Sequence, residues 1–256
     1  MIELEGLSKR YGDRLAVAEL SLEVAEGELL VLLGGSGSGK TTTLKMINRL
    51  IEPTSGSVRL DGEDVTSLTP SDLRRRIGYA FQQVGLFPHL SVSENIGITP
   101  SLLGWAEDDI RERVDTLLRL VELDPDEMRD RRPDELSGGQ QQRVGVARAL
   151  AARPRVMLLD EPFGALDPLT RQRLQDSFIR IRKELGVTAV FVTHDMSEAL
   201  LLGDRIAVLS EGRMAQIGAP AELMRAPADD YVRQLLDTPR REAALVDSLL
   251  DPGSTG

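Results

Sequence analysis

A glycine-rich segment directly after a short apolar run constrains the fold of this chain more than any other feature. The segment comprises Gly34, Gly35, Ser36, Gly37, Ser38, Gly39, Lys40 and Thr41. It follows the apolar residues 29–33, which predict a strand buried on both faces. A loop of this pattern between a strand and a helix is typical of a backbone cradle for phosphate groups. The chain is therefore expected to fold around a strand–loop–helix unit.

The chemistry of phosphate binding explains the residue types in this segment. Glycines let backbone N–H groups turn inward, and the helix predicted from Lys40 to about Leu50 points its positive end at the same oxygens. Lys40 supplies a charge for the β- and γ-phosphates, and the Thr41 hydroxyl is expected to bind Mg²⁺. Thr42 is expected to contact the nucleotide as well. The alternative is a flexible Gly/Ser turn, which the flanking strand and helix disfavour.

Strands and helices alternate along most of the chain, which predicts an α/β fold with a mainly parallel sheet. Strands are expected at 2–7, 15–24, 29–33, 57–60, 77–81, 156–159, 187–193 and 206–209, and helices at 107–121, 138–152, 169–185 and 196–202. The opening strands predict an antiparallel β subdomain, and residues 88–152 an inserted helical subdomain. One domain is expected at 1–236 and a short tail at 237–256, with a short helix at 241–250.

Composition excludes several classes of protein. The formal net charge is −10 and basic residues are scattered, so we do not expect the chain to bind nucleic acid. With no cysteine, disulfides and thiolate metal sites are excluded. No apolar run approaches the ~18 residues needed to span a bilayer, and the first residues do not resemble a signal peptide.

Two acidic residues end a second apolar run. Asp160 and Glu161 follow residues 156–159, and such a strand end in an enzyme with a phosphate cradle supplies a Mg²⁺ ligand. We expect Asp160 to lie on the metal side and Glu161 to act as the general base that polarises the attacking water. The alternative is a pair of solvated acids at a strand end.

His194 follows a third apolar strand, and we expect it to contact the γ-phosphate because ligands bind at the carboxyl ends of parallel strands. A lone histidine is also often structural. His89 is assigned no chemistry.

Residues 136–140 add a third cradle-like motif, in which Ser137, Gly138, Gly139 and Gln140 begin a predicted helix. Alone it fits a simple helix N-cap. Between the phosphate cradle and the Asp-Glu strand it resembles the signature motif of ABC ATPases, and the resemblance extends from about Met1 to about Leu236. It implies a head-to-tail homodimer that sandwiches two ATP molecules, with the signature of one subunit facing the phosphate loop of the other.

The resemblance also implies roles for single residues. Tyr11 resembles the aromatic residue that stacks on adenine, with a surface tyrosine as the alternative. Gln82 resembles the glutamine that contacts Mg²⁺ and water and senses the membrane partner. Asp167 resembles a residue that crosses the dimer interface, and His194 the switch histidine. Gly35 departs from the pattern, because many relatives have proline there; we expect nucleotide binding to survive the change.

Several segments are similar to a narrower group, the ATPases of importers for glycine betaine, carnitine and choline. They are residues 45–56, 82–89 and 138–145, while 161–168 fits importers in general. The resemblance implies membrane permease subunits, an indirect substrate-binding protein and a location at the cytoplasmic face of the membrane. Residues 84–88 are a candidate permease contact. About twenty residues after Leu236 leave no room for the regulatory module of some relatives, so osmotic sensing is expected elsewhere.

Other interpretations of the function remain open. One is an importer for another solute, or an exporter. An ABC ATPase acting on nucleic acid would be expected to carry coiled-coil or zinc insertions, and a GTPase would be expected to carry an Asn-Lys-x-Asp motif; neither feature is present in the sequence.

Overall fold

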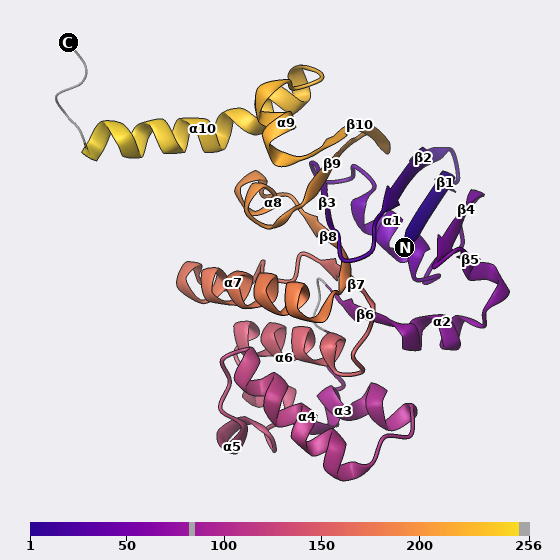
Figure 1. The fold of residues 1–256 in the computed structure, drawn as a ribbon, viewed down its shortest axis with the longest axis vertical. Coiled ribbons are helices and arrows are strands. Elements are labelled where there is room, and N and C mark those ends of the chain that lie inside the picture. Colours follow the sequence, from indigo (N-terminus) through magenta and orange to yellow (C-terminus); the bar gives the residue numbers. More distant parts are fainter. Residues whose placement is uncertain (82–84, 251–256) are drawn as a thin grey trace.

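A six-stranded sheet forms the centre of the molecule in the computed structural model, which describes residues 1–81 and 85–250, some of 238–250 by their backbone alone (Figure 1). Its strand order is β10-β9-β3-β8-β7-β6. The strands are β3 (Leu29–Leu33), β6 (Ile77–Ala80), β7 (Val156–Asp160), β8 (Thr188–Thr193), β9 (Arg205–Ser210) and β10 (Arg213–Gly218). Neighbouring strands are parallel except for β10 and β9, so the predicted mainly parallel sheet is confirmed.

The continuous apolar runs arise because both faces of this sheet are covered. Successive side chains of a strand point to opposite faces. In β3, Leu30 and Leu32 join one hydrophobic cluster, whereas Leu29, Val31 and Leu33 join the other. All five are buried. A strand of this kind has no room for polar residues until it leaves the sheet, which is where the glycine-rich segment begins.

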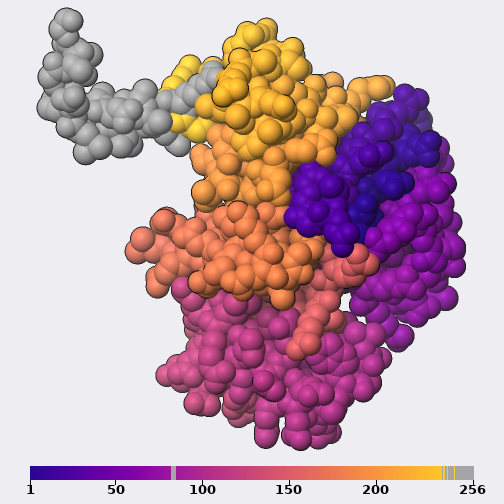
Figure 2. All heavy atoms as spheres, viewed as in Figure 1, coloured from indigo at the N-terminus to yellow at the C-terminus, as the bar shows by residue number. Residues whose placement is uncertain are grey.

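An antiparallel sheet of order β2-β1-β4-β5 covers one face together with α1 (Figures 1 and 2). Its strands are β1 (Ile2–Tyr11), β2 (Arg14–Val24), β4 (Ser55–Leu60) and β5 (Glu63–Asp64), and the adjoining helices are α1 (Lys40–Ile47), the 3₁₀ helix η1 (Val65–Ser67) and α2 (Pro70–Arg76). Helix α1 is shorter than predicted, since it ends at Ile47 and Arg49 adopts a left-handed backbone with φ 47°.

A helical layer lies between β6 and β7 in the chain, within the expected 88–152, and forms the lower, magenta part of Figures 1 and 2. It contains α3 (Val92–Leu102), α4 (Glu107–Leu120), α5 (Pro125–Met128), the 3₁₀ helix η2 (Pro133–Glu135) and α6 (Gly138–Leu150). Ser91 and Glu94 form a capping box that starts α3. This layer packs on the second face of the sheet, in the same cluster as Phe191 of β8.

The C-terminal part differs most from the sequence prediction. It comprises α7 (Pro168–Leu185), α8 (Met196–Leu202), α9 (Pro220–Arg225) and α10 (Asp230–Leu250). Strand β10 and helix α9 were not predicted, and the helix predicted at 241–250 begins at Asp230 instead. It begins earlier because Val232 and Leu236, four residues apart, are both fully buried against the core. The expected boundary at 236/237 therefore falls inside α10, which leads away from the body (Figure 1).

Strand β6 and helix α6 approach each other closely at Gly78. A Cβ atom at this position would lie 2.3 Å from the carbonyl oxygen of Ala149 and 2.9 Å from a ring carbon of Pro154. Both positions are too close for a real contact, and the first is backbone, which cannot rotate away. Gly78 thus sets the distance between the sheet and the helix that carries the signature motif.

Replacing Gly78 by alanine is expected to push β6 away from α6 and to lower the free energy of unfolding by about 1–3 kcal/mol. For a chain of this size that is a fall in the thermal midpoint of about 2–4 °C per kcal/mol. Circular dichroism during heating measures it. Gly164→Ala is the matched control, because its Cβ would meet its nearest neighbour at an ordinary 3.5 Å. Equal midpoints for the two variants would contradict the steric argument.

Candidate active site

The ends of three neighbouring strands bring the predicted site residues together. Strand β8 lies between β3 and β7, with Thr193 paired to Leu33 and Val192 paired to Asp160. Because the three strands are parallel, their carboxyl ends share one edge of the sheet. The loops that leave this edge carry Lys40, Glu161 and His194.

The loop after β3 is shaped by close backbone contacts that only glycine permits. A Cβ at Gly34 would lie 2.2 Å from the carbonyl oxygen of Leu209, and one at Gly39 would lie 2.7 Å from that of Ala16. Gly39 also has a φ of 101° and stands immediately before α1. These contacts fix where the loop turns and where the helix begins, and so place the first N–H groups of α1 at the loop's centre.

Lys40 is the first residue of α1, and its side chain lies inside this loop. Only 6% of the residue's surface is exposed. Its Nζ donates to the carbonyl oxygens of Gly34 at 2.7 Å and Gly35 at 2.9 Å, and lies 3.4 Å from Ser38 Oγ. Burial lowers the pKa of Lys40, an effect opposed by nearby acidic residues. Two carbonyl oxygens and one hydroxyl therefore surround the buried ammonium group, and none of these three contacts is with a carboxylate.

Thr41 and Asp160 join the loop to the end of β7. The Thr41 hydroxyl donates to Asp160 Oδ1 at 2.9 Å, and Asp160 is 3% exposed. Burial raises the pKa of Asp160, and the hydrogen bond from Thr41 acts in the opposite direction. A hydroxyl and one carboxylate beside a phosphate cradle fit Mg²⁺, which takes few protein ligands and completes its shell with water and substrate oxygens. In the described part of the chain, no three His, Cys, Asp or Glu side chains form a metal cluster.

Glu161 leaves β7 through a strained turn. Its φ is 47°, unusual for a residue with a Cβ, and its backbone N–H donates to the carbonyl oxygen of Val192 at 3.0 Å. Glu161 Oε1 lies 3.1 Å from Nδ1 of His194, whose side chain is 67% exposed. The turn therefore directs the carboxylate toward the end of β8 and pairs it with the histidine.

Gln142 is a site residue that the sequence analysis did not identify. It lies on α6, is 4% exposed, and bonds both ends of the loop after β7. Its Nε2 donates to the carbonyl oxygen of Glu161 at 3.0 Å, and its Oε1 accepts from the N–H of Ala165 at 2.9 Å. The sequence contained one indication of its role, which is a glutamine on the buried face of the helix predicted at 138–152. This side chain connects the helical layer to the backbone that carries Glu161.

A cavity of about 410 Å³ opens beside the loop. Its lining residues are Tyr11, Arg14, Ala16, Gly37, Ser38, Gly39, Lys40, Thr41 and Thr42. Tyr11 ends β1 and is 51% exposed, with the ammonium of Lys9 5.2 Å from its ring centroid. Arg14, which the sequence analysis also missed, adds a positive charge to the same wall. The cavity thus combines an exposed aromatic ring, two cations and helix N–H groups.

The signature segment lies in the helical layer, and Figure 1 shows α6 well separated from α1. Ser137 caps α6: its Oγ accepts from the N–H of Gln140 at 3.3 Å, while Gln140 Oε1 accepts from the N–H of Ser137 at 2.9 Å. Gly138 and Gly139 follow in its first turn. None of these four residues lines the cavity beside Lys40.

The predicted roles of two further residues, Asp167 and Gln82, stay untested. Asp167 caps α7, with its Oδ1 accepting from the N–H of Thr170 at 3.0 Å, and this hydrogen bonding lowers its pKa. Its expected place at a dimer interface stays a prediction. Gln82 lies outside the described residues, and its expected role stays a prediction too.

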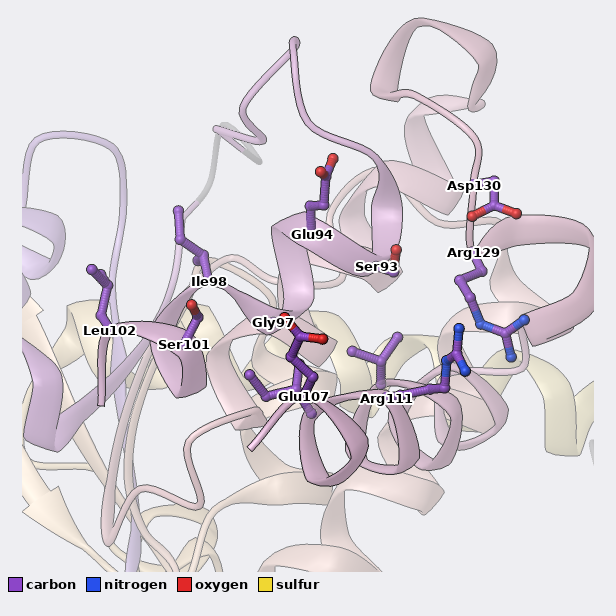
Figure 3. Close-up of a pocket in the computed structure, with 12 residues that line it drawn as sticks. Ser93, Glu94, Gly97, Ile98, Ser101, Leu102, Glu107, Arg111, Arg129 and Asp130 are labelled. Atoms are coloured by element: carbon purple, nitrogen blue, oxygen red, sulfur yellow. The ribbon is translucent and has the colours of Figure 1, made fainter. Parts of the chain in front are cut away.

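A second hollow, of about 510 Å³, lies between α3 and α4 (Figure 3). Ile98 and Leu102 lie toward one end, and Arg129 and Asp130 toward the other. Over the described residues, no helix has the length and apolar character needed to cross a bilayer.

Comparison with known proteins identifies the family to which the chain is similar. The family model described as ABC transporter matches residues 17–164. The chain is 52% identical to the glycine betaine/carnitine/choline transport ATP-binding protein OpuCA of Bacillus subtilis, over 94% of this chain and 63% of the relative. It is 53% identical to the glycine betaine uptake system ATP-binding protein YehX of Escherichia coli (91% and 76%). It is 51% identical to the spermidine/putrescine import ATP-binding protein PotA of Acidothermus cellulolyticus (90% and 59%).

A solved structure has the same fold. It is the dimeric, post-hydrolysis state of the ATP-binding cassette MJ0796 bound to ADP and Pi, with 35% sequence identity and a TM-score of 0.80 over 86% of this chain and 99% of that one. The chain spans about 63% of the length of OpuCA. The family match covers more than half of the chain and includes the phosphate loop, the signature segment and the Asp160–Glu161 pair, and the chain therefore belongs to the ABC transporter family of ATP-binding domains.

Proposed function

We propose that this chain binds ATP with Mg²⁺ and hydrolyses it to power an ABC importer, most specifically one for glycine betaine, choline or carnitine. The observation that carries the proposal is the meeting of three strand ends, where Thr41 contacts Asp160 and Glu161 contacts His194. This edge brings together an ammonium group, a hydroxyl–carboxylate pair and a carboxylate–histidine pair. Those are the groups that phosphoryl transfer to water needs.

ATP would bind with its phosphates against the N–H groups of the loop and the start of α1. Lys40 would exchange its carbonyl contacts for phosphate oxygens, and the Tyr11 ring would stack on the adenine. Thr41 and Asp160 would hold Mg²⁺, which supplies charge neutralisation of the phosphate oxygens when bound. Most of the rate acceleration would come from such fixed charges and dipoles.

Glu161 would act as general base. Water attacks the γ-phosphorus, the bond from that phosphorus to the bridging oxygen of ADP breaks, and the proton of the water passes to the Glu161 carboxylate. The contact between Nδ1 of His194 and Oε1 of Glu161 supports this role, because it orients the carboxylate at the edge where the γ-phosphate would lie. His194 would also contact the γ-phosphate through its exposed ring.

A head-to-tail homodimer would complete the site. Ser137, Gly138 and Gly139 present the exposed start of α6 away from their own phosphate loop, so they can serve the γ-phosphate bound by a second copy. The dimeric state of the MJ0796 cassette supports this arrangement. Asp167, exposed at the start of α7, would lie at the same interface.

A permease helix would dock on the helical layer, from the loop before α3 to the hollow of Figure 3. Phe87 is 41% exposed, and its backbone is fixed by buried Asn95, which accepts from the Phe87 N–H at 2.8 Å and donates to its carbonyl oxygen at 3.2 Å. The hollow has an apolar floor and charges of both signs, which suits a short amphipathic segment. This permease contact would keep the chain at the cytoplasmic face of the membrane, with the substrate-binding protein acting on the permease.

The solute is assigned from the relatives. OpuCA and YehX are named for glycine betaine and related compounds, and segments 45–56 and 82–89 of this chain resemble that group. An importer for another solute is the alternative, because PotA, named for spermidine and putrescine, is 51% identical.

Glu161→Gln is expected to retain ATP binding and lower kcat by about 100-fold or more, because the amide cannot accept the proton. The variant should also accumulate as a dimer with ATP, detected by size-exclusion chromatography. Lys40→Ala is the contrast: it should lose nucleotide binding, measured by calorimetry. Near-normal hydrolysis by Glu161→Gln would remove Glu161 as the base.

Phe87→Ala is expected to reduce the amount of permease that co-purifies with this chain, because it removes the exposed ring from the docking surface. Leu185→Ala is the control, since Leu185 is also exposed but ends α7, outside the helical layer. ATP hydrolysis by the isolated chain is measured in parallel to separate lost docking from a damaged site. Full co-purification and permease-dependent hydrolysis with Phe87→Ala would exclude this surface.

The solute is tested by uptake of labelled glycine betaine, choline and carnitine in cells at high salt. Cells with the wild-type chain are expected to take up at least one of them, and cells with Glu161→Gln to lose that uptake. Unchanged uptake of all three, with ATP hydrolysis by the purified chain confirmed, would discard the quaternary-amine assignment and leave the ATPase proposal in place.

A further inference from the structure

The phosphate loop makes a contact that comes from the far end of the chain. The backbone N–H of Gly35 donates to the hydroxyl of Tyr231 at 3.0 Å, although 196 positions separate the two residues. Tyr231 lies at the start of α10, and its hydroxyl is 3.5 Å from the carbonyl oxygen of Leu209 near the end of β9. The phenol thus bridges the loop and the sheet.

The start of α10 is held firmly enough to position this hydroxyl. Val232, next to Tyr231, and Leu236 are fully buried in the core cluster, and the helix contacts α8. Asp229 Oδ1 accepts from the Val232 N–H at 2.8 Å, which satisfies one free donor of the first turn. The tyrosine ring is partly buried against the same cluster. The hydroxyl is therefore presented to the loop by a packed element.

The peptide group between Gly34 and Gly35 connects this hydroxyl to Lys40. Its N–H, on Gly35, donates to the Tyr231 hydroxyl, and its carbonyl oxygen, on Gly34, accepts from Lys40 Nζ at 2.7 Å. Gly34 lies against the Leu209 carbonyl so closely that a Cβ would not fit. The Tyr231 hydroxyl, the peptide and the ammonium therefore form one hydrogen-bonded chain, and a rotation of the peptide would move the carbonyl that positions Lys40.

Glycine at position 35 makes the contact possible. A proline there has no N–H and could not donate to Tyr231. An alanine would keep the N–H, and its Cβ would lie 3.7 Å from the Tyr231 hydroxyl, an ordinary contact. The N–H group that proline lacks is thus the group that binds Tyr231.

We propose that Tyr231 is a positioning residue for nucleotide binding. Through it, α10 fixes the peptide group between Gly34 and Gly35, and hence the phosphate loop around Lys40. The inference rests on the proposed function, because it concerns the affinity of the same loop for nucleotide. Tyr231 lines a neighbouring hollow of about 440 Å³, which shares Arg14, Gly37 and Ser38 with the cavity beside Lys40. Tyr231 itself does not line that cavity. It acts through Gly35 rather than on the nucleotide.

The test compares Tyr231→Phe with the parent chain in three backgrounds, wild type, Gly35→Ala and Gly35→Pro, by calorimetric titration with Mg²⁺ and ADP. Loss of one hydrogen bond is expected to weaken binding about three- to tenfold in the wild-type and Gly35→Ala backgrounds. In Gly35→Pro the bond is already absent, so Tyr231→Phe is expected to change the Kd little. The KM for ATP should rise by the same factor while kcat stays within about twofold.

Arg233→Ala, on the exposed side of the same turn, is the matched control and is expected to bind ADP as the wild type does. Equal Kd values for wild type and Tyr231→Phe, or the same loss in all three backgrounds, would overturn the inference. Solvent exchange of the Gly35 amide, followed by NMR on the unmodified chain, is independent of any variant's folding: protection supports the bond, and rapid exchange overturns it. A wild-type chain that binds no ADP and hydrolyses no ATP would overturn the proposed function and this inference together.

Discussion

The parallel register of β3, β8 and β7 is the constraint on which the site depends. The pairs Leu33 with Thr193 and Asp160 with Val192 align the three strand ends at one edge of the sheet. A slip of one residue in β7 would turn its side chains to the opposite face and carry Asp160 away from Thr41. Such a slip is disfavoured because both faces of β7 are buried in different apolar clusters. Core packing therefore determines the position of the polar groups.

Lys40 and Asp160 are buried at this edge, and their hydrogen bonds described above are with uncharged groups. The three contacts of Lys40 are with loop oxygens, and Asp160 accepts from the Thr41 hydroxyl. Desolvation disfavours the charged form of each, which is visible in the lowered pKa of Lys40 and the raised pKa of Asp160. Nearby opposite charges oppose both shifts without cancelling them. A polyphosphate and a divalent cation would add further opposite charge at this edge.

The sequence was sufficient for the features that depend on local pattern. The apolar run 29–33 matched β3 because a strand buried on both faces carries no other residue type, and the glycines of the loop matched a turn that excludes Cβ atoms. The start of α10 was missed because it is stabilised by Val232 and Leu236 packing on a distant core, which periodicity in a short segment does not reveal. Gln142 was missed for a related reason: its importance lies in a loop 19 and 23 positions away. Long-range side-chain contacts leave little trace in one sequence.

Two of these long-range contacts reach the site from separate helices that pack in the same hydrophobic cluster of the sheet. Gln142 binds the loop of Glu161 from the helical layer, and Tyr231 binds the phosphate loop from the C-terminal helix. Each hydrogen bond is worth about 1 kcal/mol, roughly a fivefold change in an equilibrium constant, whereas the buried strands are fixed by many apolar contacts. A small displacement of α6 or α10 would therefore alter the loops while the sheet kept its register. The sheet thus keeps the reacting groups in order, and hydrogen bonds from α6 and α10 fix the loops that hold them.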